Sequence, residues 1–164
     1  LSQAAALAPA CFNNQPLRFI RIKNKKALDI VGEHVSKGNY WVKKAPLVFA
    51  LATKPDLDCR MEGGRDFALF DSGLAAENLV LQATREGLVA HPIAGFDAIG
   101  LRRRLGIPKD YILITLIVMG YLGEEASLSE KHRKQEHSES SRLPIESVIF
   151  HEHWSAAKSE EEGE

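Results

Sequence analysis

The sequence predicts a single α+β domain, an α/β sandwich in which helices cover both faces of a mixed sheet around one long central helix. The length of 164 residues is enough for one sizeable core, and 45% hydrophobic with 26% charged residues is ordinary for a globular protein. Apolar runs typical of strands also alternate along the chain with stretches at helical spacing. These observations favour helices packed against a sheet.

Four apolar runs of strand length are predicted to form the sheet. The run LVFALA is continuously apolar, which predicts a strand covered on both faces. The longest run, ILITLIVMG, is far shorter than the roughly 20 residues that span a bilayer, so no membrane segment is predicted. The expected strands are Leu17–Lys23, Leu47–Ala52, Leu88–Ile93 and Ile112–Tyr121.

Four helical stretches separate these strands, at residues 1–8, 26–36, about 65–86 and 98–105. Asp97 is the expected N-cap of the last helix. The long helix is expected to be buried on most sides, whereas its Asp71 and Glu77 are expected to be exposed or interface charges. One face carries Phe67, Phe70, Leu74 and Leu81, and another carries Ser72, Ala76, Ala83 and Gly87, which are small enough to let a second helix approach closely.

The chain beyond residue 123 is predicted to hold three kinds of segment. Residues 124–141 are polar and charge-rich, which is typical of a surface connection. Residues 145–154 are apolar enough to dock on another surface, and residues 155–164 form an acidic, flexible tail. The predicted domain therefore runs from residue 1 to residue 154, with the charged loop inside it.

Charge and cysteine content argue against several classes of function. The net charge of −1 gives no reason to expect nucleic acid or an anionic membrane as a partner. Cys11 and Cys59 are too few for a disulfide framework and lack metal-ligand spacing, and His151 with His153 lacks a third ligand. No metal is predicted, and a reducing cytoplasmic compartment is favoured. Cys11 has no recognisable base beside it, so it is not predicted to be a nucleophile.

Three loops remain as candidate binding elements, and none of them carries proton-transfer machinery. In Pro9–Gln15 two prolines bracket amide side chains that donate and accept hydrogen bonds. Pro92–Gly95 offers main-chain groups, and Ser140–Pro144 offers the guanidinium of Arg142, a good phosphate ligand. Such a set suits a planar, phosphate-bearing cofactor that brings its own chemistry. Taken alone, Pro9–Gln15 is equally well explained as a plain helix-to-strand turn.

The motif P-A-C-F-N-N-Q-P, followed by an aromatic-bearing strand, resembles the P-S-x-x-N-x-Q-P-W motif of the nitroreductase family, the FMN-dependent NAD(P)H oxidoreductases. Six further segments match the family in the same order. They are Gly38–Tyr40, Asp71–Leu79, Pro92–Asp97, Gly106–Pro108, Val118–Tyr121 and Ser141–Pro144.

The resemblance implies an enzyme, a cytoplasmic homodimer with FMN at the subunit interface and the small-residue face of the long helix at the dimer seam. NADH or NADPH would pass hydride to flavin N5, and a nitroaromatic or quinone acceptor would then take it in a ping-pong cycle. The flavin carries the chemistry, so no catalytic side chain is implied. The implied FMN-binding residues are Ala10, Cys11, Phe12, Asn13, Gln15, Pro92, Ile93, Ala94, Gly95 and Arg142, with Tyr40, Trp41 and Lys43 on the substrate side.

Some positions depart from the family pattern. Ala10 and Cys11 stand where serine is usual, Leu17 stands where tryptophan is usual, and Ala94 stands where many relatives have an acidic residue. The arginine-bearing arm that precedes the first helix in relatives, and that helps to bind the phosphate, is not in this sequence. Two alternatives therefore stay open: a specialised member with one physiological substrate, and a non-catalytic flavin-binding or interaction module.

Overall fold

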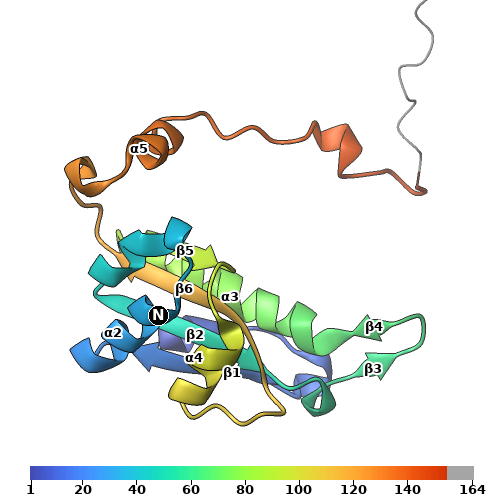
Figure 1. Cartoon of the computed structure of the whole chain (residues 1–164). Coiled ribbons are helices and arrows are strands. Elements are labelled where there is room, and N and C mark those ends of the chain that lie inside the picture. The colour runs from blue at the N-terminus through green and yellow to red at the C-terminus, as the bar shows by residue number, and fades with distance from the viewer. Residues whose placement is uncertain (155–164) are drawn as a thin grey trace, which may run out of the picture. The chain divides into compact units, whose positions relative to one another are not determined.

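The computed structural model describes residues 1–154 and divides the chain into two compact units, the first from Leu1 to Glu124 and the second from Glu125 (Figure 1). The boundary coincides with the start of the predicted charged connection. The predicted acidic tail, residues 155–164, lies outside the described residues. None of the helices in the described chain combines the length and the apolar character needed to cross a membrane.

The first unit is built on a four-stranded sheet with the order β1 (Leu17–Ile22), β2 (Leu47–Thr53), β6 (Ile112–Gly120) and β5 (Val89–Ile93). Every neighbouring pair is antiparallel, so the α+β class is confirmed but the sheet is not mixed. Between β1 and β2 the chain passes through α2 (Lys25–His34) and the 3-10 segment η2 (Lys37–Lys44). These two elements return the chain to the end at which β1 finished, which makes β2 antiparallel to it.

Helices cover both faces of this sheet, as predicted. One core cluster includes α2 and α4 (Ala98–Arg104), and the other includes α1 (Ser2–Ala6) and the long helix α3 (Phe67–Arg85). Successive residues of β2 alternate between them: Val48 and Ala50 pack in the first cluster, and Phe49 packs in the second. A strand with both faces covered needs apolar side chains at every position, which accounts for the run LVFALA.

The helix ends follow local rules that are visible in the sequence. Asp97 caps α4 by accepting a hydrogen bond from the Gly100 N–H at 2.9 Å, as predicted. Asp66 caps α3 in the same way through the Ala68 N–H at 3.1 Å. Gly87, which follows α3, adopts φ +75°, a left-handed conformation that glycine tolerates best.

The orientation of α3 differs from the prediction. The helix is not buried on most sides: Phe70 and Leu81 are 60% and 58% exposed, whereas the small residues Ser72 and Ala83 are fully buried within the chain. Small side chains let the helix lie close to the sheet, so Ser72 and Ala83 face inward, together with the fully buried Leu79, while Phe70 and Leu81 face out. The predicted seam of small residues is therefore not an exposed dimer surface as a whole, because Ser72 and Ala83 already pack inside this chain.

The second unit contains a helix that the sequence did not predict. Within the polar connection, α5 (Glu130–Glu136) is capped by Ser129 and carries a Lys134–Glu130 ion pair at 2.9 Å. A short helix of this kind is stabilised by its cap and by i,i+4 charge pairs. Its sequence therefore shows no apolar periodicity from which the helix could be predicted. The docking of residues 145–154 stays a prediction.

Candidate functional site

The loop from Pro9 to Gln15 connects α1 to β1 and is anchored at both ends. Ala8 is 7% exposed, and Pro16 is fully buried with its carbonyl accepting a 3.1 Å hydrogen bond from the Thr53 hydroxyl. Between these anchors the side chain of Phe12 is 85% exposed. The loop is therefore a surface feature fixed to the core at its two ends.

The backbone of this loop is unusual. Phe12, Asn13 and Gln15 adopt φ values of +47°, +59° and +50°, and they are three of the four non-glycine residues with positive φ in residues 1–154. Such conformations cost roughly 1–2 kcal/mol per residue, less for asparagine. The Gln15 amide supports the turn by donating to Asn13 Oδ1 at 3.1 Å. Strain that is held in place by its surroundings is common at binding sites.

Cys11 in this loop is joined by a disulfide to Cys59, 48 residues away, with a Cα–Cα distance of 6.2 Å. Cys59 follows the 3-10 turn η3 (Pro55–Leu57) and precedes the hairpin of β3 (Arg60–Met61) and β4 (Arg65–Asp66). The sequence predicted no disulfide framework, and this single disulfide is a feature that the sequence analysis missed. A separation of 48 residues does not indicate that the two cysteines pair. Their sulfurs meet only because the loop before β1 packs against the segment after η3.

The main-chain N–H of Cys11 donates a 2.7 Å hydrogen bond to the carboxylate of Asp71 on α3. Asp71 is 2% exposed, which corrects the prediction of an exposed or interface charge; Glu77 is exposed as expected. Burial raises the pKa of Asp71, the neighbouring Asp58 carboxyl raises it further, and the Cys11 N–H opposes both effects. The burial of Asp71 could not be inferred from the helix pattern, because its neighbour Phe70 is exposed in this structure.

Asp58 and Asn14 complete the cluster around the disulfide. Asp58 Oδ1 accepts hydrogen bonds from the Asn14 amide at 3.2 Å and from the Cys59 N–H at 2.8 Å. A ligand atom from each of Cys11, Asp58 and Cys59 lies within 4.8 Å of the others. Sulfurs bonded to each other are not thiolates, so the oxidised cluster does not offer metal ligands.

The predicted binding loop Pro92–Gly95 is held in position by close packing around Gly95. Its carbonyl accepts hydrogen bonds from the Ser36 N–H at 2.9 Å and the Asn39 amide at 3.0 Å. A Cβ at Gly95 would lie 2.7 Å from Ser36 Oγ and 2.8 Å from Asn39 Nδ2, so only glycine fits without movement. Ile93 is 5% exposed and packs in the core, which leaves only its main chain for any ligand.

The main-chain N–H groups of Ala94 and Gly95 have no hydrogen-bond acceptor among residues 1–154. Pro92 and Ile93 lie at the end of β5, so these two groups follow directly after the last paired strand residue. Two adjacent free donors at a strand end can receive the edge of a heterocyclic ligand.

Tyr40, Trp41 and Lys43, predicted on the substrate side, all lie in η2. The Trp41 ring packs against His91 with centroids 5.1 Å apart and borders the core cluster of α2. The stem of Lys43 crosses α2 at Gly32, where an added Cβ would meet Lys43 Cγ at 2.9 Å. Trp41 and the stem of Lys43 therefore have packing roles, and whether any of the three also contacts a substrate stays a prediction.

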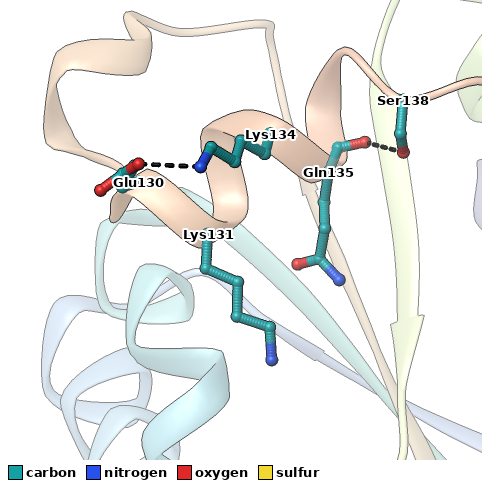
Figure 2. A pocket seen from close by; sticks show the side chains of 5 residues that line it. All are labelled: Glu130, Lys131, Lys134, Gln135 and Ser138. Carbon is teal, nitrogen blue, oxygen red and sulfur yellow. Dashed lines mark hydrogen bonds and ion pairs between the residues drawn. The ribbon is translucent and has the colours of Figure 1, made fainter.

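Arg142 belongs to the second unit and donates to the Ser141 carbonyl at 2.9 Å. Its role as a phosphate ligand stays a prediction. In the same unit a hollow of about 530 Å³ lies along α5, and Figure 2 shows the side chains that line it. Its wall residues Glu130, Lys131, Lys134, Gln135 and Ser138 are all exposed and come from one helix and the turn after it, so they do not form the apolar enclosure that a flavin ring needs.

Comparison with known proteins agrees with this architecture. The model of the nitroreductase family matches residues 30–121, more than half of the chain, and the chain belongs to the nitroreductase family. The matched region contains Gly95 and η2. The disulfide loop around Cys11 and the Arg142 segment lie outside it.

Individual relatives are moderately similar. An uncharacterised 15.4 kDa protein of Mycolicibacterium smegmatis is 32% identical over 54% of this chain and 59% of its own length. A protein of Methanothermobacter thermautotrophicus, provisionally named NADH dehydrogenase/NAD(P)H nitroreductase, is 29% identical over 74% of this chain and 63% of its own length. The chain thus spans about six tenths of these two relatives.

Among solved structures, an oxidoreductase containing FMN superposes with a TM-score of 0.82 at 25% identity, covering 94% of this chain and 80% of that one. A nitroreductase family protein of Clostridium difficile superposes with a TM-score of 0.73 at 24% identity, covering 93% and 83%. The α+β fold with helices on both faces of the sheet is therefore that of the nitroreductases.

Proposed function

We propose that this chain is an FMN-dependent NAD(P)H oxidoreductase that reduces nitroaromatic or quinone-type acceptors. The observation that carries the proposal is the similarity to a solved oxidoreductase that contains FMN, which extends over 94% of this chain. The provisional NAD(P)H nitroreductase name of a relative points to the same reductant. Bound FMN would supply the hydride chemistry by accepting hydride from the nucleotide and passing it to the acceptor.

The protein's own part would be binding and orientation. The free N–H groups of Ala94 and Gly95 are suited to donate to the polar edge of an isoalloxazine ring. The loop of Ala10, Cys11, Phe12, Asn13 and Gln15 would form a wall beside the ring. Arg142 would bind the phosphate, and Tyr40, Trp41 and Lys43 would border the acceptor. No side chain needs to act as an acid or base.

We further propose that the protein acts as a homodimer in the cytoplasm, where NAD(P)H is available. The outward face of α3 supports association, since Leu69, Phe70 and Leu81 are 51%, 60% and 58% exposed. Phe70 and Leu81 project from the same side of the helix, and exposed large apolar side chains on one side suit a surface that another subunit covers.

The test is an absorption spectrum of the full chain reconstituted with FMN, followed by anaerobic titration with NADH and with NADPH. We expect a flavin band that bleaches with one of the nucleotides and returns on adding menadione or nitrofurazone. Failure to bind FMN would disprove the proposal. Bound FMN that no nucleotide reduces would point to a flavin-binding module, and reduced FMN that neither acceptor oxidises would point to a specialised substrate.

Gly95 offers a matched pair of variants for the same experiment. Gly95→Ala places a Cβ against Ser36 and Asn39 beside the proposed ring edge, so FMN affinity should fall at least tenfold. Gly123→Ala adds the same methyl group where no atom lies within 4 Å and should bind FMN like the wild type. Equal affinities for the two variants would remove Gly95 from the FMN site.

A further inference from the structure

We propose that Cys11 and Cys59 form a reversible dithiol/disulfide site that reacts with dithiols, and that its oxidation state controls the conformation of the loop from Ala10 to Gln15. The proposal concerns this chain's own covalent state and does not depend on FMN binding. It rests on where the two sulfurs lie, on what the bond holds in place and on the backbone that follows Cys11.

The disulfide lies outside the hydrophobic core. Cys11 and Cys59 are both half-buried, both stand in connecting segments, and neither belongs to either core cluster. The fold has two apolar clusters built from the strands and helices, so it does not depend on this one cross-link for a core. A half-buried disulfide between two surface loops is open to attack by a thiol from solution.

The bond fixes the N-terminal side of the left-handed stretch. Cys11 directly precedes Phe12, the first residue of the loop with positive φ, and Pro16 closes the stretch through its buried hydrogen bond to Thr53. Without the disulfide, the N-terminal side keeps the Cys11–Asp71 hydrogen bond and the contacts from Asn14 to Asp58 and Cys59. It also keeps two main-chain hydrogen bonds within the turn, from the Asn13 N–H to Ala10 and from the Asn14 N–H to Cys11.

The conformation of the loop is disfavoured in isolation, because Phe12 and Gln15 carry Cβ atoms and yet have φ values of +47° and +50°. Such residues stay in this region only while their surroundings hold them there. Opening the disulfide removes one of these constraints, so the reduced loop should move away from the left-handed conformation. Oxidation should restore it.

The reaction balances as an ordinary thiol–disulfide exchange. One thiolate of the dithiol attacks a sulfur of the Cys11–Cys59 bond and forms a mixed disulfide, and the displaced sulfur takes up a proton. The second thiol of the reagent, as its thiolate, then attacks the reagent sulfur of the mixed disulfide and displaces the protein sulfur, which takes up a proton. Two electrons and two protons pass to the protein, which gains two thiols, and the reagent leaves as a cyclic disulfide.

The first experiment equilibrates the folded full chain with dithiothreitol at stepped ratios of its reduced and oxidised forms, then alkylates it with N-ethylmaleimide and measures its mass. We expect two added groups at the reducing end, none at the oxidising end, and a reversible transition between them without unfolding. A disulfide that opens only after denaturation would overturn the proposal. So would two free thiols at every ratio.

The second experiment tests the conformational consequence by limited proteolysis with chymotrypsin. Phe12 and Tyr121 are 85% and 77% exposed, so both are candidate cleavage sites in the first unit. Cleavage after Phe12 should be at least five times faster in the reduced protein, while cleavage after Tyr121 should not change. Equal rates after Phe12 in the two states would overturn the control of the loop by the disulfide.

Cys59→Ser provides the matched variant, because Cys59 lies outside the residues proposed to contact FMN. Its cleavage after Phe12 should be fast with or without dithiothreitol. If this variant fails to fold, the comparison of the reduced and oxidised wild type still decides the question. Neither measurement involves a flavin, so failure of the proposed enzymatic function would leave this result intact, and the reverse also holds.

Discussion

The main-chain N–H of Cys11 and the carboxylate of Asp71 are joined by a 2.7 Å hydrogen bond between residues 60 positions apart. This bond ties the surface loop before β1 to the buried side of α3. It accounts for an acidic residue on a helix face that otherwise holds Ala68, Ser72 and Ala75. A buried carboxylate is tolerated where main-chain donors compensate for part of its lost hydration.

Replacing Asp71 should show what this bond contributes. Asp71→Ala leaves the Cys11 N–H without its acceptor and should lower the free energy of unfolding by about 1–3 kcal/mol. Asp71→Asn keeps an acceptor oxygen and should lose less. Urea unfolding of the oxidised proteins measures both variants. If the Ala and Asn variants are equally stable, the hydrogen bond is not what Asp71 provides.

The raised pKa of Asp71 predicts a pH dependence with a definite sign. A carboxyl whose folded pKa is raised above its ordinary value of 3.8 binds protons more tightly in the folded state. Its contribution to stability is therefore fully present below about pH 4 and is lost as the pH rises through the raised pKa. Wild type should lose stability relative to Asp71→Asn across that interval, and subtracting the two unfolding curves cancels the carboxyl groups that do not interact with Asp71. A flat difference would contradict the prediction.

The close packing at Gly95 predicts a stability effect separate from any ligand. Gly95→Ala pushes the ends of the Ser36 and Asn39 side chains away and weakens the Asn39–Gly95 hydrogen bond, so it should cost about 0.5–1.5 kcal/mol. Gly123→Ala, with open space around the added methyl group, should be close to neutral. Thermal unfolding of both apoproteins measures the difference, and a neutral Gly95→Ala would mean that the two side chains move away freely.

The two faces of α3 should respond differently to mutation. Leu79→Ala opens a cavity in the core cluster that contains Phe49 and should cost about 2–5 kcal/mol, because Leu79 is fully buried. Leu81→Ser removes an apolar group that is 58% exposed in the single chain and should leave subunit stability nearly unchanged.

The Leu81→Ser variant also tests the proposed dimer. Sedimentation velocity should show that Leu81→Ser shifts the protein toward the monomer, since it alters the outward face of α3 without disturbing the core. If the wild type sediments as a monomer, the proposed association is wrong. If Leu81→Ser remains fully dimeric, the interface lies elsewhere.

Much of the architecture was predictable because it rests on local chemistry. The strands at 47–53 and 112–120, the Asp97 cap and the helix after residue 66 each follow from neighbouring residues. The family was likewise visible in short motifs. The helix α5 was not predicted, because a cap and a charge pair stabilise it and neither of them produces an apolar pattern of helical period in the sequence.

The amino-acid sequence by itself determined the order and kind of the main elements, the apolar strands and the membership of the nitroreductase family. Only the tertiary structure decided the antiparallel order of the sheet, the inward face of α3, the burial of Asp71 and the pairing of Cys11 with Cys59. The reason is physical: propensity and patterning act between residues a few positions apart. A disulfide across 48 residues and a hydrogen bond across 60 exist only because the packed core brings distant segments together.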